Sequence, residues 1–578
     1  MKIGRTHYAQ DINETLIGQE VQVAGWVHRR RDHGGLIFVD LRDRTGLVQI
    51  VCQPDDSGFA TLDRVRAEYV IQVAGRVRAR PEGMANPELA SGAVEIVPHE
   101  VLLLSSAKTP PFSVAEAEEV DELLRLKYRY LDLRRPSLMR NLWLRDKSLM
   151  VVREFFHEHG FLDIETPALA RSTPEGARDF LVPSRLQPGH FYALPQSPQI
   201  FKQLLMVAGV DRYYQVAKAF RDEDLRADRQ PEFTQIDVEM SFMDQDAILS
   251  LMEAMLHRLF AEVMDISLDP FPRMTWHQAM KAYGSDKPDL RAGPPLVNLT
   301  DVARTVDWPV LRDAEHVVGV VLPQYQPTRK ELDGWAEAAR QGGASGLVWI
   351  VREAGGMRSS ASKWLGDQAL ATLANAAHVE PGDALLVVAG NGWLPYEVAG
   401  QLRLLFARHA GRVQTGWRFL WVTEFPLFEW SEEEGRLVSA HHPFTMPHPD
   451  DIEKIESDPA SVRSQAYDVV LNGTELASGS LRIYQPDLQA RIFQVLGLSA
   501  EEIQNKFGFL LDAFQYGAPP HGGIAFGLDR LLMLMAGADS IRDVIAFPKT
   551  ARGTDPLMNA PSPVDESQLQ AVHLTVKW

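Results

Sequence analysis

The sequence predicts a multidomain α+β protein that begins with a small β-barrel and carries an inserted α/β domain. Three observations predict this architecture. Short strand-like runs fill the first hundred residues, long amphipathic helices begin near residue 121, and residues 291–415 have strands and helices of their own. A length of 578 residues suits about three or four domains.

The barrel is predicted for residues 1–105, where five strand-like runs alternate with turns that contain glycine or proline. The runs cover residues 21–27, 36–41, 47–52, 69–77 and 93–104. Five short strands in about a hundred residues are typical of a small barrel such as an OB-fold. Residues 106–135 include Pro110-Pro111 and form a predicted linker.

The larger domain is predicted in two parts, residues 136–290 and 416–578, with the insert 291–415 between them. Residues 138–159 have apolar positions at helical spacing, and Gly160 is a plausible helix end. Two strands with a charged loop between them are predicted within residues 210–245, followed by a helix at 246–265. The insert's strands are predicted at 317–322, 346–351 and 383–388.

Composition excludes several classes of protein. The single cysteine, Cys52, rules out internal disulfides and zinc-finger sites, and we interpret it as a small buried apolar residue. Neither a signal peptide nor a run long enough to span a bilayer is evident, so the expected location is the cytoplasm. A net charge of −18 argues against a basic surface overall, although local basic grooves remain compatible with it.

The charged loop is the first segment that suggests chemistry. It begins Phe220-Arg221-Asp222-Glu223 and ends Gln230-Pro231-Glu232-Phe233. An arginine at a strand end can clamp a phosphate with two parallel hydrogen bonds, and nearby acids can bind an amine or a sugar hydroxyl. The alternative is a solvated hairpin tip with ion pairs.

Two further segments fit a nucleotide. Gly527-Leu528-Asp529-Arg530 begins a predicted helix after a glycine-rich turn, and a helix N-terminus with an arginine makes an anion site. Asp468 and Glu475 stand on neighbouring strand segments, where two acids can hold Mg²⁺ with the help of substrate phosphates. Ordinary packing and solvated surface acids are the respective alternatives.

Together these segments resemble the three signature motifs of class II aminoacyl-tRNA synthetases. Glu165-Thr166-Pro167 is similar to the first motif, 220–223 to the second and 527–530 to the third. Residues 172–179, 196–202, 283–289 and 441–444 resemble the bacterial type of aspartyl-tRNA synthetase, in subclass IIb. The resemblance covers nearly the whole chain and is weakest in the insert. It implies an antiparallel-sheet catalytic domain and a homodimer formed through the segment ending at Pro167.

The resemblance also implies how ATP and Mg²⁺ are held. Arg221 would bind the α-phosphate, Arg530 the far phosphate, and Phe233 would stack on adenine. The remaining implied contacts to ATP are Asp222, Glu223, Gln230, Glu475, Gly527, Leu528 and Asp529. Asp468 and Glu475 would hold Mg²⁺.

For L-aspartate, the resemblance implies one set of residues at the amino group and another at the side-chain carboxylate. The first set is Glu175, Ser197, Gln199 and Asp237. The second is Lys202, Arg482 and His441, with His442 beside them; Arg221 would also contact the amino acid. A buried carboxylate needs cations and hydrogen bonds, so an unpaired lysine and arginine would favour aspartate over asparagine and disfavour lysine. Alternatively, Lys202 is a surface lysine and Arg482 pairs with Asp468 or Glu475.

The barrel is the predicted reader of the tRNA anticodon. By resemblance, Phe38 would stack on an anticodon base, and Arg31, Gln49 and Glu95 would contact base edges. Alternatively, Phe38 belongs to the barrel core and the arginine run 29–31 is a solvated turn. His33 and Gly83 resemble members that charge tRNA-Asn as well as tRNA-Asp.

The implied reaction is a two-step ligation in which aspartate and ATP give aspartyl-adenylate, and the aspartyl group then passes to the terminal adenosine of tRNA. Three rivals remain: an asparagine ligase, an RNA-binding protein without catalysis, and an amino-acid ligase that does not use tRNA. An RNA-binding protein without catalysis would not need the ATP-site residues that this chain retains, which are Arg221, Asp468, Glu475 and Arg530. The barrel argues against an amino-acid ligase that does not use tRNA.

Overall fold

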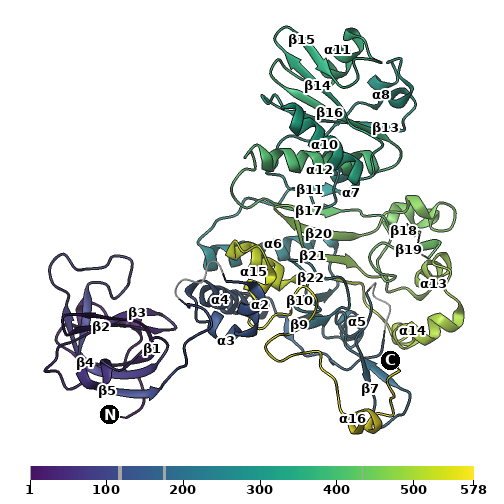
Figure 1. The fold of residues 1–578 in the computed structure, drawn as a ribbon. Coiled ribbons are helices and arrows are strands. Elements are labelled where there is room, and N and C mark those ends of the chain that lie inside the picture. The colour runs from purple at the N-terminus through teal and green to yellow at the C-terminus, as the bar shows by residue number, and fades with distance from the viewer. Residues whose placement is uncertain (1, 115–119, 173–176, 433, 578) are drawn as a thin grey trace. The chain divides into compact units, whose positions relative to one another are not determined.

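The computed structural model describes residues 2–114, 120–172, 177–432 and 434–577 (Figure 1). The chain divides into two compact units. Unit 1 comprises Met1–Asp146, Leu225–Gln230 and Leu532–Asp565, and unit 2 comprises Lys147–Asp224, Pro231–Leu531 and Glu566–Trp578. The division falls within the long helix α4 (Pro136–Glu158), which is followed by Gly160 at a φ of 76°.

Unit 1 contains the predicted barrel, which is closed in the order β1-β2-β3-β5-β4. Its strands are β1 (Glu20–His33), β2 (Leu36–Asp43), β3 (Gly46–Cys52), β4 (Val70–Ala79) and β5 (Val94–Ser105), with the short helix α1 (Phe59–Leu62) between β3 and β4. Alternate valine and isoleucine side chains fill the interior, and Cys52 is buried among them. The prediction of a small OB-fold barrel is therefore confirmed.

Strand β1 is longer than the sequence predicted. It passes a bulge between Val27 and Arg29 and stays paired with β2 as far as His33 opposite Leu36. Residues 29–31 therefore lie in a strand, and the alternative that they form a solvated turn is wrong. The turn itself falls at Gly34 and Gly35, whose φ values of 66° and 92° favour glycine.

Helices α2 (Glu122–Lys127) and α3 (Arg129–Asp132) surround a buried carboxylate in unit 1. Asp132 is fully buried and pairs with Arg125, Arg129 and Arg135. Arg129 also donates hydrogen bonds to the backbone oxygens of Arg542, Ile545 and Ala546. These bonds join the segment 542–546 to the helices that precede α4.

Unit 2 is built on an eight-stranded sheet in the order β11-β17-β20-β21-β22-β10-β9-β6. Neighbouring strands are antiparallel except for β11 with β17 and β6 with β9. The strand bounds are β6 (Leu162–Asp163), β9 (Arg212–Phe220), β10 (Glu232–Ser241), β11 (Arg273–Thr275), β17 (Phe419–Thr423), β20 (Ala466–Leu471), β21 (Thr474–Leu481) and β22 (His521–Gly527). The prediction of a largely antiparallel sheet in the larger domain is confirmed.

Helices pack around this sheet, and several begin with side-chain caps. They are α5 (Gln199–Val207), α6 (Gln245–Met264), α7 (Trp276–Tyr283), α13 (Pro486–Val495), α14 (Ala500–Phe514) and α15 (Leu528–Ala536), whereas α16 (Glu566–Ala571) has no buried residue. Asp244 caps α6 by accepting the N–H of Ala247, and Ile248 of the first turn is completely buried. Two small hairpins, β7 (Leu181–Pro183) with β8 (Phe191–Ala193) and β18 (Phe428–Ser431) with β19 (Arg436–Ser439), stand apart from the sheet.

The insert has a five-stranded sheet of its own in the order β12-β13-β16-β14-β15. The strands are β12 (Val297–Asn298), β13 (His316–Leu322), β14 (Val348–Glu353), β15 (Gly356–Ser359) and β16 (Ala384–Gly390). One apolar core lies beneath α10 (Arg329–Gln341) and α12 (Leu394–His409). A second core involves α8 (Thr300–Ala303), α9 (Pro309–Arg312) and α11 (Asp367–Ala376). The insert is thus a two-faced α/β domain.

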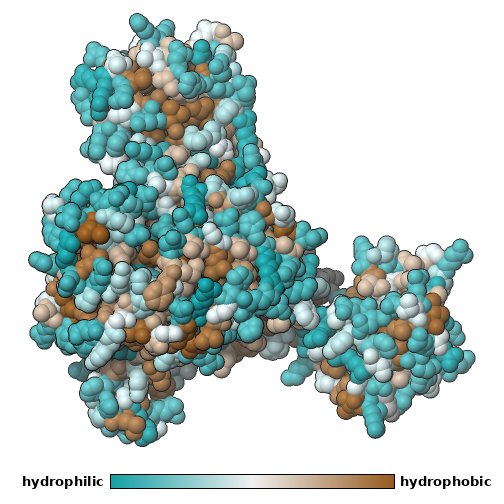
Figure 2. Space-filling model, turned by 180° about the vertical axis from the view of Figure 1, so that it is seen from behind, coloured by the Kyte–Doolittle hydropathy of each residue, from teal (hydrophilic) through white to brown (hydrophobic). Residues whose placement is uncertain are grey.

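The surface drawn in Figure 2 is largely hydrophilic, with separate apolar areas. Among the residues that the structure describes, no helix has the length and apolar character needed to span a bilayer.

Candidate active site and nucleic-acid interface

Four buried charged side chains meet on one face of the sheet in unit 2. Lys202 Nζ, from α5, lies 2.8 Å from Asp237 Oδ1 and 3.5 Å from Glu239 Oε2. Arg482, just after β21, donates from Nε to Glu239 Oε1 at 3.0 Å. Lys202 is 2% exposed, so the alternative of a surface lysine is wrong. Arg482 pairs with Glu239, so the alternative partners Asp468 and Glu475 are also wrong.

The expectation of an unpaired lysine and arginine needs correction. Two cations and two carboxylates make the cluster of Lys202, Asp237, Glu239 and Arg482 neutral, which is how a protein interior tolerates buried charge. Burial favours the neutral acid, but Arg482 and Lys202 outweigh it and lower the pKa of Glu239. The cluster therefore offers a ligand directed hydrogen-bond donors and acceptors, with no net charge.

Glu239 is a site residue that the sequence prediction missed. It lies two positions after Asp237 on β10, and side chains two apart in a strand point to the same face. This alternation along β10 is the sequence signal that could have identified Glu239. Gly523 of β22 stands opposite Glu239, and a Cβ at Gly523 would come within 2.0 Å of Glu239 Oε2. The glycine thus makes room for the carboxylate.

His442 faces two donors with only one acceptor nitrogen to offer. Its Nδ1 accepts the backbone N–H of Phe444 at 3.2 Å, and its Nε2 lies 2.5 Å from a terminal nitrogen of Arg482. Burial and then Arg482 lower the pKa of His442 well below its usual value, so the imidazole is neutral. A neutral imidazole accepts at one nitrogen only, so one of these contacts sets two N–H groups against each other. At 2.5 Å the nitrogens of His442 and Arg482 leave no room for an atom between them, so a ligand oxygen could accept from both only from beside the pair.

Of the residues predicted at the amino group of the amino acid, the structure describes Ser197, Gln199 and Asp237. Asp237 Oδ2 is buried and makes no hydrogen bond within the described part of the chain. Gln199 begins α5 three residues before Lys202, and Ser197 Oγ accepts the N–H of Gln199 at 3.3 Å. Glu175 lies outside the described residues. A buried acceptor without a partner costs roughly 1–3 kcal/mol, which a ligand with N–H groups can recover.

Arg221, Phe233, Arg530 and Asp529 are four of the residues predicted to bind ATP. Arg221 lies with its guanidinium carbon 5.2 Å from the centre of the Phe233 ring, and its Nε is buried without a hydrogen bond in the described chain. Arg530 donates to the backbone oxygen of Glu475 at 2.7 Å. Asp529 Oδ2 accepts the N–H of Thr234 at 2.8 Å and so ties the start of α15 to β10.

Several other predicted ATP contacts have local structural roles. Gly527 closes β22 opposite Gln235, and the Leu528 side chain is fully buried. The backbone N–H of Asp222 donates to the backbone oxygen of Arg178, and Arg178 Nε donates to the backbone oxygen of Asp222. Glu223 lies in the loop between β9 and β10. Gln230 is in unit 1, where its side-chain amide exchanges two hydrogen bonds with the backbone of Lys549.

Asp468 and Glu475 have the properties expected of residues that bind a cation. Asp468 Oδ1 is buried with no hydrogen bond among the described residues, and His441 Nε2 lies 3.9 Å from it. Asp468, and then burial, raise the pKa of Glu475. Burial of His441 disfavours its charged form, but the carboxylate of Asp468 outweighs burial and raises the pKa of His441. Two adjacent carboxylates fit Mg²⁺ when substrate phosphates complete its shell. No group of three or more potential metal ligands occurs in the described chain.

In the barrel, Phe38 is half-buried and stands outside the apolar core cluster, so the alternative of a core residue is wrong. The ring of His33 meets it edge-on at 5.7 Å, and Arg31 lies 5.8 Å from its centre. Arg31 also pairs with Asp40 at 2.8 Å. Gly83 has a φ of 77° with open space around it.

Gln49 and Glu95, which were predicted to contact base edges, are buried in the barrel. Gln49 Nε2 donates to Glu95 Oε2 at 2.9 Å. Arg78 Nε donates to the other carboxylate oxygen at 2.7 Å. Contact with a base would require these side chains to exchange one of their present partners.

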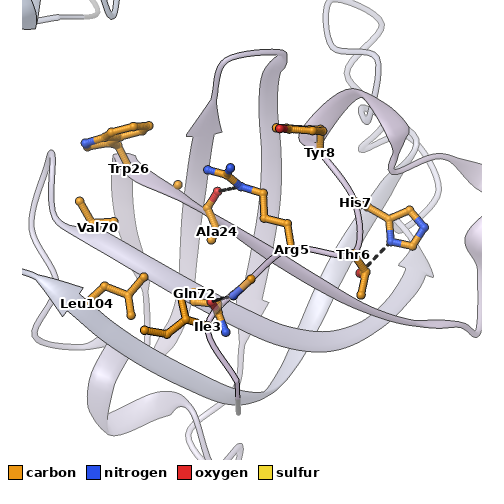
Figure 3. Close-up of a pocket in the computed structure, with 12 residues that line it drawn as sticks. Ile3, Arg5, Thr6, His7, Tyr8, Ala24, Trp26, Val70, Gln72 and Leu104 are labelled. Carbon is orange, nitrogen blue, oxygen red and sulfur yellow. Dashed lines mark hydrogen bonds between the residues drawn. The ribbon is translucent and has the colours of Figure 1, made fainter.

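A cavity of about 480 Å³ lies elsewhere in the barrel, between the N-terminal segment and strands β1 and β4 (Figure 3). Its lining includes Arg5, Tyr8 and Trp26 and none of the predicted anticodon residues. Arg134 lies over the Trp26 ring, and Arg5 and Arg44 lie over Tyr8. These aromatic faces already have cationic partners.

Comparison with known families identifies both parts of the chain. Residues 121–551 match the family of class II tRNA synthetases (D, K and N), and residues 21–104 match the OB-fold nucleic acid binding domain. The chain belongs to the class II tRNA synthetases. The match to the synthetase model includes all three segments that the sequence resemblance rested on.

Relatives of this class II synthetase match it along its full length. The Aspartate--tRNA(Asp/Asn) ligases of Symbiobacterium thermophilum and Anoxybacillus flavithermus are 52% and 51% identical, over 99% of each chain. The Aspartate--tRNA ligase of Geobacillus kaustophilus is 51% identical over the same share.

Solved structures share its fold. Asparaginyl-tRNA synthetase from Pyrococcus horikoshii, complexed with asparaginyl-adenylate, has a TM-score of 0.60 at 18% identity, over 95% of this chain and 99% of that one. Aspartyl tRNA synthetase from Entamoeba histolytica has a TM-score of 0.58 at 18% identity, over 93% and 90%.

Proposed function

We propose that this synthetase is an ATP-dependent ligase that joins L-aspartate to tRNA. Family membership and full-length relatives named aspartate–tRNA ligases support the reaction class. The observation that carries the choice of amino acid is the buried His442–Arg482 contact, in which an N–H group of each residue points at the other. A side-chain carboxylate oxygen beside these two nitrogens could accept a hydrogen bond from both.

The carboxylate is preferred to an amide because the two cations that would contact it only donate, and Asp237 and Glu239, the acceptors of the cluster, already pair with those cations. Lys202 has three N–H groups, Arg482 has five, and neither can accept a hydrogen bond. Asparagine would present its NH₂ group to the same donors, and a buried donor that lacks an acceptor costs about 1–3 kcal/mol. Asp237 Oδ2 supplies the acceptor for the α-ammonium group.

The reaction then needs positioning and charge stabilisation without a nucleophilic side chain. The α-carboxylate of aspartate attacks the α-phosphorus of ATP, and pyrophosphate leaves. The 3′-hydroxyl of the terminal adenosine of tRNA attacks the carbonyl carbon of the adenylate, and AMP leaves. Arg221 stabilises the charge that develops on the α-phosphate, while Phe233 beside it supports the adenine ring. Arg530 binds the phosphates that depart.

Asp468 and Glu475 are the residues that would hold Mg²⁺. When bound, the ion neutralises the phosphates and orients them for in-line attack. The buried, unbonded Oδ1 of Asp468 and the raised pKa of Glu475 support this assignment.

The barrel binds the anticodon of tRNA-Asp, and we extend the substrate to tRNA-Asn. Phe38 offers a half-buried ring for stacking with Arg31 beside it, and His33 packs against the same ring. Relatives named for both tRNAs support the broader specificity. The chain would act as a homodimer through the segment ending at Pro167, in the cytoplasm, where tRNA and ATP are available.

Amino-acid-dependent exchange of pyrophosphate into ATP tests the activation step. Aspartate should support exchange and asparagine should not. Arg221→Ala should lower exchange at least about 100-fold, because it removes a cation worth on the order of 3 kcal/mol in the transition state. The exposed Arg340→Ala, in the insert, is the control. Normal exchange by Arg221→Ala, or exchange with asparagine alone, would refute the assignment.

Aspartylation of purified tRNAs tests the broader specificity. The enzyme should charge both tRNA-Asp and tRNA-Asn with aspartate. Failure to charge tRNA-Asn would restrict the enzyme to tRNA-Asp and leave the activation chemistry untouched.

A further inference from the structure

A line of buried hydrogen bonds runs from a backbone carbonyl to the predicted amino-acid site. His521 Nδ1 lies 2.8 Å from the oxygen of Pro519, and His521 Nε2 lies 3.2 Å from Gln203 Nε2. Gln203 Oε1 accepts from Gln199 Nε2 at 3.1 Å. Gln203 follows the segment 196–202 and His521 begins the glycine-rich segment that leads to Gly527, but the sequence analysis gave neither residue a role.

The carbonyl at one end fixes the direction of every bond in the line. The oxygen of Pro519 can only accept, so the proton of His521 is on Nδ1. Nε2 of a neutral ring is then an acceptor, and it takes a hydrogen from Gln203 Nε2. Gln203 Oε1 must therefore face Gln199, and it takes a hydrogen from Gln199 Nε2.

The surroundings of His521 keep it neutral. Its ring is 2% exposed at the start of β22, with Glu239 and Arg482 as the charged groups nearby. Burial lowers the pKa of His521, and the attraction of Glu239 does not reverse the shift. Gln203 is completely buried on the same face of α5 as Gln199 and Lys202. The line is thus shielded from water, which would otherwise offer alternative partners.

We propose that His521 and Gln203 are positioning residues that turn the side-chain oxygen of Gln199 towards the ammonium group of the amino acid. The inference rests on the proposed function. With its nitrogen held by Gln203, Gln199 presents Oε1 at the open end of the line. Asp237 Oδ2, beside Lys202, is the second acceptor. Reversal of the Gln199 amide would set an NH₂ group against the substrate ammonium.

Gln203→Met tests the line with a side chain of similar length that cannot donate a hydrogen bond and accepts one only weakly. Aspartate and succinate are compared as ligands, because succinate keeps both carboxylates and lacks the amino group. We expect KM for aspartate in pyrophosphate exchange to rise about tenfold, as for the loss of a hydrogen bond to a charged group. KM for ATP and the inhibition constant of succinate should stay within about twofold of the wild type. Gln72→Met, at a buried glutamine in the barrel, is the control.

Gln203→Glu tests the direction of the bonds. A carboxylate at residue 203 still accepts from Gln199 but can meet His521 only if Nε2 carries a proton, which makes the ring an imidazolium. KM for aspartate should then be near the wild-type value in mildly acidic buffer and rise as the pH increases and His521 loses that proton. The wild-type enzyme should lack this dependence.

Three results would overturn the inference. Equal weakening of aspartate and succinate by Gln203→Met would indicate a general loss of structure. Unchanged KM for aspartate in that variant would remove Gln203 from the role. A Gln203→Glu profile parallel to that of the wild type would contradict the bond directions. In each case the wild-type enzyme activates aspartate; a wild type without aspartate-dependent exchange would instead refute the proposed function.

Discussion

Arg482 and Glu239 form a paired fork in the interior of unit 2. Nε of Arg482 donates to one carboxylate oxygen at 3.0 Å, and a terminal nitrogen donates to the other at 3.2 Å. The two residues are 243 positions apart in the chain. Because both are nearly inaccessible to water, neither charge has an alternative partner in solvent. The fork thereby holds Arg482 in place beside His442.

Glu239→Gln should destabilise unit 2 by about 3–5 kcal/mol, because it leaves Arg482 and Lys202 with one buried carboxylate between them. Chemical unfolding followed by tryptophan fluorescence should show an earlier transition. KM for aspartate should also rise, because Arg482 is no longer oriented. Glu262→Gln, which removes one exposed partner of Arg258, should leave the transition unchanged. Equal behaviour of the two variants would show that the buried fork contributes nothing.

Gly523→Ala should disturb the same fork from the opposite strand. The added Cβ would lie 2.0 Å from Glu239 Oε2 and 2.2 Å from the backbone oxygen of Val238, so the carboxylate or the strand must move. We expect a loss of at least about tenfold in kcat/KM for aspartate activation, since small displacements of binding groups are costly. Gly355→Ala, where a Cβ meets open space, is the matched control. Wild-type activity in Gly523→Ala would mean that Glu239 can shift without consequence.

His442 should make the folded protein sensitive to mild acid. Burial and Arg482 lower its pKa well below the ordinary value of 6.5, so it stays neutral when folded but gains a proton in the unfolded chain. The unfolded state then binds more protons below about pH 6.5, and folding stability falls as the pH falls through that region. His442→Gln should therefore lose less thermal stability between about pH 7.5 and 5.5 than the wild type does. A thermal scan series with the exposed His99→Gln as reference checks this, and identical slopes would contradict it.

Phe38→Ala should weaken tRNA binding without affecting the activation of aspartate. Loss of one stacked base costs about 1–3 kcal/mol, which corresponds to roughly 5- to 150-fold in KM for tRNA. Pyrophosphate exchange, which involves only the amino acid and ATP, should be unchanged. Ile17→Ala, at an exposed apolar residue of unit 1, is the control. A parallel loss of exchange and charging would show that Phe38 acts on folding.

The barrel and the catalytic sheet could be predicted from the sequence because strand alternation, helix periodicity and glycine turns are local properties. The three motif segments likewise keep their chemistry in a few consecutive residues, as in 220–223 and 527–530. Predictions failed where a residue's partner is distant. Arg482 was weighed against Asp468 and Glu475, fourteen and seven positions away, whereas its partner is Glu239.

The sequence by itself determined the class of protein and a fold with a barrel and a catalytic domain, and it is the source of most of the side chains proposed to face the substrates. Only the tertiary structure decided that Lys202 and Arg482 are neutralised by Asp237 and Glu239, that Gln49 and Glu95 are buried together, and that His521 orients Gln203. The physical reason is that the partner of a buried charge or amide is set by which strands and helices lie side by side. Residue spacing along the chain carries no record of that adjacency.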